Sequence, residues 1–159
     1  YVNSAKLYIV GDGDVLQAMR QYADKLQLND KVLFIGKIDF NDLFEMTISA
    51  DLGLSFEKDT CLAYRYALPN KIFDYINAQI PVLVSDLPEY SNIIKSHPVG
   101  AVLTSRNARS VATQMTNLLS VPKNNWLERL LLAKHVYCWE NQEQELLSVF
   151  QDSDDIFKK

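Results

Sequence analysis

The chain has 159 residues, of which 48% are hydrophobic and 23% charged, and its 20 acidic residues against 16 Lys and Arg give a formal net charge of −4. This balance is that of a globular domain with one core, and it excludes a disordered or fibrous chain. The mild acidity argues against nucleic-acid binding, and no apolar run approaches the roughly 20 residues that span a bilayer.

Five short apolar runs recur along the chain and predict strands. They are rich in β-branched and aliphatic residues and do not alternate with charged positions, which is typical of strands covered on both faces of a parallel sheet. The runs occupy residues 7–10, 32–35, 52–56, 82–84 and 101–103.

Segments with helical periodicity separate these runs. The clearest is an apolar stripe that begins at Val15 and ends at Leu26, and Pro69 and Pro88 each suit the first turn of a further helix. More helices are expected over residues 41–50, 110–119, 126–139 and 143–150. Repeated strand–helix–strand units predict an α/β fold: a Rossmann-like, doubly wound parallel sheet of about five strands with helices on both faces. We expect residues 1–159 to form a single domain.

The cysteines and histidines do not follow a metal-site or disulfide pattern. Cys61 and Cys138 lie far apart, and His135 stands three residues before Cys138, as part of a helix. A structural zinc site would need about two more ligands than this pair supplies. We therefore expect no metal ligands and a reducing compartment, the cytoplasm.

In an open parallel sheet, ligands bind at the carboxyl ends of the strands, where helices begin. After the first run, Gly11 and Gly13 permit a tight turn and a close backbone approach. A dinucleotide-binding fingerprint, the mark of an oxidoreductase domain, would need a third Gly where Leu16 stands. It would also need an acidic residue where the second strand ends in Gly36 and Lys37, so this alternative is disfavoured.

The junction after the third run holds the densest polar group. Pro69, Asn70 and Lys71 start a helix, and Asp74 falls one turn further on, so these polar groups can share a face. Free N–H groups with a Lys suit a diphosphate, and a carboxylate suits vicinal sugar hydroxyls. The alternative is an amphipathic helix whose polar residues only face water. After the fourth run, Asp86 is expected to cap a helix.

In order and spacing, these segments resemble the C-terminal half of GT-B fold glycosyltransferases of the group 1 or family 4 type. The resemblance covers roughly residues 5–120 and is most specific over residues 69–82, from the Pro-Asn-Lys helix start to the Pro-Val strand entry. It implies the donor-binding domain for a nucleotide-diphosphate sugar, with no metal required. Asp12 and Asp14 around Gly13 also resemble the Asp-x-Asp metal motif of another glycosyltransferase architecture, although turn and cap roles account for them.

The resemblance also implies roles for individual residues. The loop from Gly36 to Ile38 would contact the base, the helix start at Pro69 would direct N–H groups at the diphosphate, and Asp74 would bind the ribose hydroxyls. We therefore expect a donor site made of Gly11, Gly13, Gly36, Lys37, Ile38, Tyr66, Pro69, Asn70, Lys71 and Asp74. No catalytic residue is assigned.

The chain departs from the family pattern at two places. The family motif has two Glu eight positions apart, and these positions hold Tyr66 and Asp74 here. Gln79 stands where the family usually has Gly. The missing first Glu favours an alternative function: a catalytically degenerate GT-B half that acts as an interaction or regulatory module.

The resemblance implies further properties of the whole protein. We expect a fragment that lacks the N-terminal acceptor domain and the first strand of the present domain, and that does not turn over alone. Its expected partners are the nucleotide-sugar donor and that acceptor domain, in glycan or polysaccharide biosynthesis. We expect neither a nucleic-acid partner nor a transmembrane segment, although the full-length enzyme can associate with a membrane surface.

Overall fold

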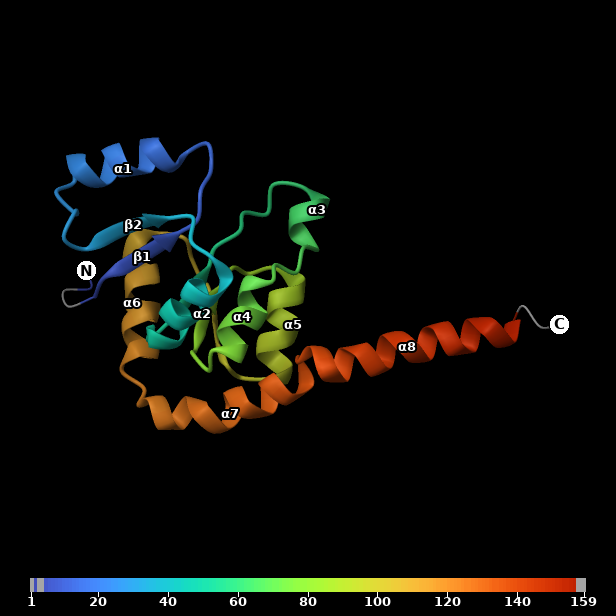
Figure 1. Ribbon diagram of the computed structural model, residues 1–159. Coiled ribbons are helices and arrows are strands. Elements are labelled where there is room, and N and C mark those ends of the chain that lie inside the picture. Colours follow the sequence, from blue (N-terminus) through green and yellow to red (C-terminus); the bar gives the residue numbers. More distant parts are fainter. Residues whose placement is uncertain (1, 3–4, 157–159) are drawn as a thin grey trace. The chain divides into compact units, whose positions relative to one another are not determined.

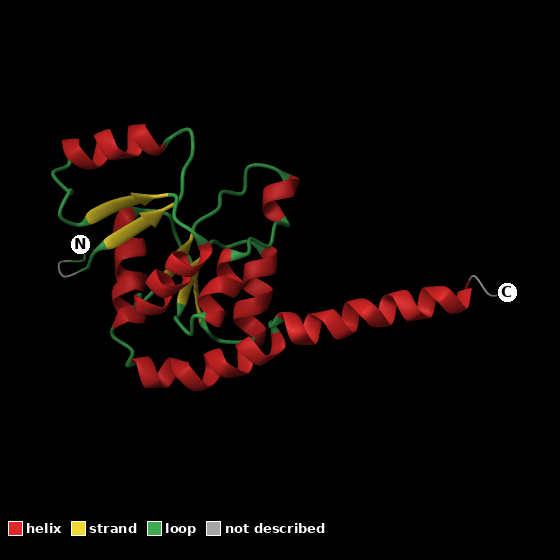
Figure 2. Cartoon of the chain, in the orientation of Figure 1, coloured by secondary structure: helices red, strands yellow, loops and turns green. Residues whose placement is uncertain are grey.

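The computed structural model describes residue 2 and residues 5–156 (Figure 1). These residues form two compact units, which divide between Ser49 and Ala50. Both units are built from parallel strands with helices between them (Figure 2).

The first unit contains a two-stranded parallel sheet. Its elements are β1 (Leu7–Val10), α1 (Leu16–Lys25), β2 (Val32–Gly36) and α2 (Phe40–Ser49). Arg20 of α1 fixes the helix to the sheet, since its Nη2 donates to the main-chain oxygen of Phe34 at 3.0 Å and its guanidinium lies 5.1 Å from the centre of the Phe34 ring. Ile9 pairs with Phe34 but Val10 pairs with Gly36, so one extra residue, Ile35, shifts the register next to Gly36, whose φ is +84°.

The second unit contains a three-stranded parallel sheet in the order β3–β4–β5. Its strands are β3 (Gly53–Ser55), β4 (Val82–Val84) and β5 (Gly100–Val102). Its helices are α3 (Leu62–Arg65), α4 (Lys71–Asn77), α5 (Pro88–Ser96), α6 (Ala108–Leu119), α7 (Lys123–Val136) and α8 (Trp139–Ile156).

The core of the second unit surrounds β4. All three residues of this strand are fully buried, because it has a hydrogen-bonded neighbour on each side and helices pack around it. The buried side chains that cover it come from four helices: Ile72 and Ile76 of α4, Tyr90 and Ile93 of α5, Leu118 of α6, and Trp126, Leu130 and Ala133 of α7. Lys134 of α7 also donates to the main-chain oxygen of Asn77 at the end of α4, at 3.1 Å.

Two glycines allow a close approach at this sheet. The Tyr75 ring covers Gly53, and a Cβ at Gly53 would overlap with that ring. The Tyr75 hydroxyl donates to the main-chain oxygen of Leu54 at 3.2 Å, which holds α4 against β3. A Cβ at Gly100 would overlap with the main-chain carbonyl of Val82 on the neighbouring strand. Both positions therefore require glycine for packing.

The structure confirms the α/β fold with parallel strands and helices on both sides. The five expected strands are present, but among the described residues they form a pair and a triplet instead of one continuous ladder. The expectation of a single domain stays a prediction. The helix expected from Pro69 begins two residues later, at Lys71, and the short helix α3 was not predicted.

The cap expected from Asp86 is wrong. Leu87 occupies the cap position of α5 in an extended conformation, followed by Pro88, and it makes no side-chain cap. Asp86 instead accepts a hydrogen bond from the Ser91 hydroxyl at 3.3 Å. None of the helices in the part of the chain that the structure describes has the length and hydrophobicity of a membrane span.

Candidate functional site

A partly buried carboxylate lies at the carboxyl end of β3. The side chain of Glu57 is only 13% exposed, and its Oε1 accepts a hydrogen bond from Lys71 Nζ at 2.8 Å. Its Oε2 accepts one from the Tyr90 hydroxyl at 2.9 Å, and the Ser55 hydroxyl lies 3.0 Å from both oxygens. These donors come from β3, α4 and α5, so Glu57 joins three elements of the second unit.

The main chain of Glu57 is fixed as well. Its carbonyl oxygen accepts from the hydroxyl of Ser85, which follows β4, at 2.7 Å. Arg106, in the loop after β5, donates from Nη2 to the same oxygen and to the Ser85 hydroxyl, the latter at 2.9 Å. Because the strands are parallel, their carboxyl ends meet at one edge. The three loops at this edge are thus tied together at Glu57.

The surroundings of Glu57 keep it ionised. Burial alone would raise the pKa of this carboxyl, but the hydrogen bonds from Lys71 and Tyr90 outweigh it and hold the pKa below its usual value of 4.5. For Tyr90, burial raises the pKa far above the usual value for a phenol, so its hydroxyl stays protonated and remains a donor. The Glu57 carboxylate is therefore paired with one cation, Lys71, and with neutral hydroxyl donors.

A groove borders this network. It has a volume of about 190 Å³ and is lined by residues 103–106, which follow β5, and by Asp59, Asp86 and Leu87. Asp59 is held by Arg65, which donates to its carboxylate from both Nε and Nη2 at 2.8–3.2 Å. Loop residues at the strand ends therefore line a polar, open groove.

The structure brings some of the predicted residues of the second unit together and separates others. Lys71 lies at the network, and its side chain is 58% exposed. Pro69 and Asn70 precede it, with the main-chain oxygen of Asn70 accepting from the N–H groups of Phe73 and Asp74 at 2.9 and 3.0 Å. Tyr66 lies at the end of α3 and is 61% exposed. Among the described side chains, no hydrogen bond joins Tyr66 or Asp74 to Glu57.

Asp74 on α4 has a raised pKa because the carboxyl is partly buried. Folding therefore favours its protonated form: its stabilising contribution is present below the usual value of 3.8 and lost as the pH rises through the raised value. We expect Asp74→Asn to raise the free energy of unfolding at pH 7 by no more than about 0.5 kcal/mol, since the carboxylate is largely exposed.

Urea unfolding at pH 7 and pH 3 measures this difference. The gain in the free energy of unfolding of Asp74→Asn should vanish at pH 3. Glu128→Gln, at an exposed position of α7, controls for the change in net charge. A loss of stability at pH 7 would show that Asp74 stabilises the fold through a contact that outweighs its burial.

The predicted residues of the first unit lie close to one another. The N–H of Gly11 donates to the main-chain oxygen of Gly36 at 2.8 Å, so the two expected loops are joined. Gly11 has a φ of +128° and Gly36 one of +84°, a conformation that glycine adopts without strain. No atom would contact a Cβ at Gly11, Gly13 or Gly36, and Lys37 and Ile38 follow directly. The space beside the α-carbons of these glycines is therefore open.

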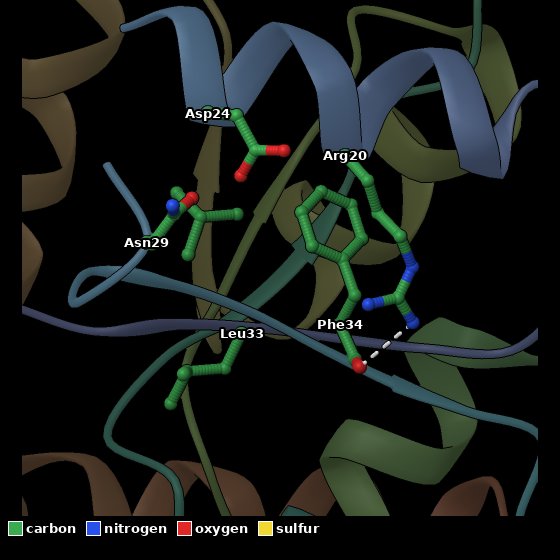
Figure 3. Close-up of a pocket in the computed structure, with 6 residues that line it drawn as sticks. Arg20, Asp24, Asn29, Leu33 and Phe34 are labelled. Atoms are coloured by element: carbon green, nitrogen blue, oxygen red, sulfur yellow. Dashed lines mark hydrogen bonds between the residues drawn. The ribbon is translucent and has the colours of Figure 1, made fainter. Parts of the chain in front are cut away.

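The first unit has a cavity of its own, with a volume of about 330 Å³, between α1 and β2 (Figure 3). It is lined by Arg20, Asp24, Asn29 and residues 32–34, and the figure shows Arg20 directed to the main-chain oxygen of Phe34. None of the predicted donor-site residues lines it. Among the described residues, no group of three or more His, Cys, Asp or Glu could hold a metal ion.

The sequence model of the family described as "Glycosyl transferases group 1" matches residues 2–121. The chain belongs to the group 1 glycosyl transferases. The match covers three quarters of the chain, from β1 through α6, and it includes every residue of the predicted donor site. The resemblance found in the sequence is thereby confirmed.

Two solved structures show the same fold as this group 1 glycosyl transferase chain. One is WaaG, a glycosyltransferase involved in lipopolysaccharide biosynthesis, with 23% identity and a TM-score of 0.61 over 95% of this chain and 37% of that one. The other is sucrose-phosphate synthase from Thermosynechococcus elongatus, with 18% identity and a TM-score of 0.69 over 96% of this chain and 39% of that one. The chain spans less than two fifths of the length of either protein. No curated protein matches.

Sequence reasoning missed five residues of the network: Ser55, Glu57, Ser85, Tyr90 and Arg106. Glu57 follows the third apolar run by two positions, and the rule that ligands bind where parallel strands end could have singled it out. Tyr90 and Arg106 carried no such signal, because their contacts with Glu57 span 33 and 49 positions of the chain.

Proposed function

We propose that this chain binds a nucleotide-diphosphate sugar and forms the donor-binding part of an enzyme that transfers the sugar to an acceptor. The observation that carries the proposal is the position of Lys71. Its ammonium lies at the edge where the strands end, with one N–H on Glu57 and the rest of the group exposed. An ammonium has three donors, so two remain for phosphate oxygens.

The chemistry of glycosyl transfer gives this cation a role. When the bond between the sugar and the diphosphate breaks, negative charge develops on the leaving phosphate oxygen. A positioned ammonium stabilises that charge more than it stabilises the bound donor, and this difference lowers the barrier. Lys71 would therefore both bind the diphosphate and assist its departure.

In the first unit, taken by itself, the proposal assigns the nucleotide base to the joined turns at Gly11 and Gly36. The space beside the α-carbons of Gly11 and Gly36 is open, and a flat base would approach the turns from that side. Lys37 and Ile38 follow Gly36 and would border the base. Asp74, on the same helix as Lys71, would accept hydrogen bonds from the ribose hydroxyls.

The remaining parts of the proposal concern the whole protein. The acceptor would bind to a separate N-terminal domain of the same protein, and the reaction would belong to glycan or polysaccharide biosynthesis in the cytoplasm. WaaG, which acts in lipopolysaccharide biosynthesis, shares the fold and supports this reaction class. The proposal assigns the diphosphate charge to Lys71 and requires no metal.

We expect Lys71→Ala to weaken the binding of the cognate nucleoside diphosphate by roughly 10- to 100-fold, the equivalent of about 1.5–3 kcal/mol for a hydrogen bond to a charged group. Calorimetric titration of the protein that carries this chain with UDP, GDP and ADP measures the change. The diphosphate that binds most tightly identifies the nucleotide.

Lys123→Ala is the matched control. Lys123 is also exposed and also pairs with a carboxylate, since its Nζ lies 2.7 Å from Asp51, but it starts α7 and lies outside the network. It should leave the affinity unchanged within about twofold. Unchanged binding in Lys71→Ala would contradict the phosphate role, and no binding of any diphosphate to the wild type would favour an interaction or regulatory module.

A further inference from the structure

Glu57 places a fixed negative charge beside the proposed phosphate-binding cation. Its Oε1 accepts from Lys71 at 2.8 Å, its Oε2 from Tyr90 at 2.9 Å, and the Ser55 hydroxyl is 3.0 Å from each. Its main-chain oxygen is held by Ser85 and Arg106. The carboxylate cannot turn away from Lys71 without leaving its other donors, so it stays in place when a ligand arrives.

These contacts also define what Glu57 does not do. A carboxylate has about four acceptor positions, and protein donors already use three of them. The side chain is 13% exposed, against 58% for Lys71. Glu57 therefore has little capacity to bind a ligand directly. It acts on a ligand through its charge.

The Lys71 ammonium would donate to both the Glu57 carboxylate and a phosphate oxygen, and this sets the distance between the two anions. Two oxygen atoms bonded to one ammonium lie roughly 4.5 Å apart. A phosphate oxygen on the free donors of Lys71 would thus lie roughly 3 Å from the cation and 4–5 Å from the Glu57 carboxylate. Lys71 attracts each negative charge on the phosphate, and repulsion from Glu57 offsets a large part of that attraction.

Resting on the function proposed above, we propose that Glu57 is a specificity-determining residue that selects an esterified diphosphate over the free one. A terminal phosphate carries about 1.5 to 2 negative charges at pH 7, whereas a phosphate joined to a sugar carries about one. The donor is the esterified form and the released product is the free form. Glu57 offsets a large part of the extra attraction that Lys71 would exert on the product, which weakens product binding after transfer.

The charge of Glu57 should change the ratio of the affinities for a free and an esterified diphosphate. For unit charges roughly 5 Å apart, Coulomb's law in the dielectric of water gives roughly a fourfold change in affinity per charge. The sensitive quantity is the affinity for a free nucleoside diphosphate divided by the affinity for its β-methyl ester. The ester adds only a methyl group and removes about one charge, so contacts with a sugar do not enter the comparison.

The test is calorimetric titration of the protein that carries this chain with UDP, GDP, ADP and their β-methyl esters, at pH 8 and low salt. We expect Glu57→Gln, which removes the charge and keeps the shape, to raise the ratio for the bound nucleotide roughly fourfold. Glu128→Gln makes the same change in net charge at an exposed position of α7 and should leave the ratio unchanged. A constant ratio in Glu57→Gln, or an equal rise in Glu128→Gln, would overturn the inference.

A second variant tests the inference without changing Glu57. In Lys71→Ala the repulsion is no longer offset, so the methyl ester should bind roughly three- to fourfold more tightly than the free diphosphate. Equal affinities in this variant would also overturn the inference. Binding of no diphosphate to the wild type would contradict the proposed function and the inference together, whereas binding with unchanged ratios would contradict the inference alone.

Discussion

Gly100→Ala is expected to lower the free energy of unfolding of the second unit by about 4 kcal/mol or more, the range reached when a substitution forces backbone apart. Gly100 pairs with Val82 on the central strand, and an added Cβ would overlap with the main-chain carbonyl and a γ-methyl of Val82. A carbonyl in a sheet cannot rotate away as a flexible side chain can. Relief therefore requires β4 and β5 to separate. Urea unfolding monitored by the fluorescence of Trp126, a buried core residue, measures the loss.

Gly13→Ala provides the contrast. No atom lies within 4 Å of a Cβ built at Gly13, and its φ is outside the left-handed range. Alanine restricts the unfolded chain, so this variant should change stability by less than about 1 kcal/mol, with a gain as the expected sign. If Gly100→Ala cost no more than Gly13→Ala, the close approach of β4 and β5 would be wrong.

The strands could be predicted because their cause is local. Val82–Val84 is a run of branched aliphatic residues that no polar residue interrupts, and such a run is stable only when both faces are covered. The pairing of strands has no local cause. Which runs share a sheet depends on packing between distant segments, and for this reason the five predicted strands gave no indication of separate β1–β2 and β3–β4–β5 ladders.

Unlike the strands, the helix α3 has no local cause in the sequence. Its four residues, Leu62–Arg65, are too few to form a stable helix from propensity alone. Arg65 binds Asp59 across the loop, and this contact depends on how the loop folds. The sequence patterns predicted no helix over these residues, and the position of Tyr66 at the exposed end of a helix could not be foreseen.

The site was predictable to the extent that it follows a motif. Lys71 was expected at the helix start because Pro-Asn-Lys precedes an apolar stripe, and the structure places it at the strand ends. The motif said nothing of its counter-ion. Glu57 lies 14 positions earlier and is directed to Lys71 by Tyr90 and Ser85, which belong to later parts of the chain. The pairing thus depends on the tertiary fold.

Tyr90→Ala is expected to destabilise the second unit by about 3–5 kcal/mol, the cost of removing a buried aromatic ring. Tyr90 is fully buried in the core, and its hydroxyl lies 2.6 Å from the Ser55 hydroxyl and 2.9 Å from Glu57. Tyr90→Phe keeps the ring and removes only the donor, so it should cost about 1–3 kcal/mol. The difference between the two variants separates packing from hydrogen bonding. Urea unfolding of both at pH 7 measures it.

The pH dependence of the stability lost in Tyr90→Phe tests whether Glu57 is the acceptor of the hydrogen bond from the Tyr90 hydroxyl. Because the folded protein holds the pKa of Glu57 below 4.5, its stabilising contribution is present above that value and lost as the pH falls through the lowered one. The cost of Tyr90→Phe should therefore shrink below pH 4.5. Tyr64→Ala, at a position 55% exposed on α3, should stay within about 0.5 kcal/mol of the wild type. A Tyr90→Phe variant as stable as the wild type would mean that the hydroxyl does not hold the carboxylate, and Glu57 would then be free to follow Lys71 when a ligand binds.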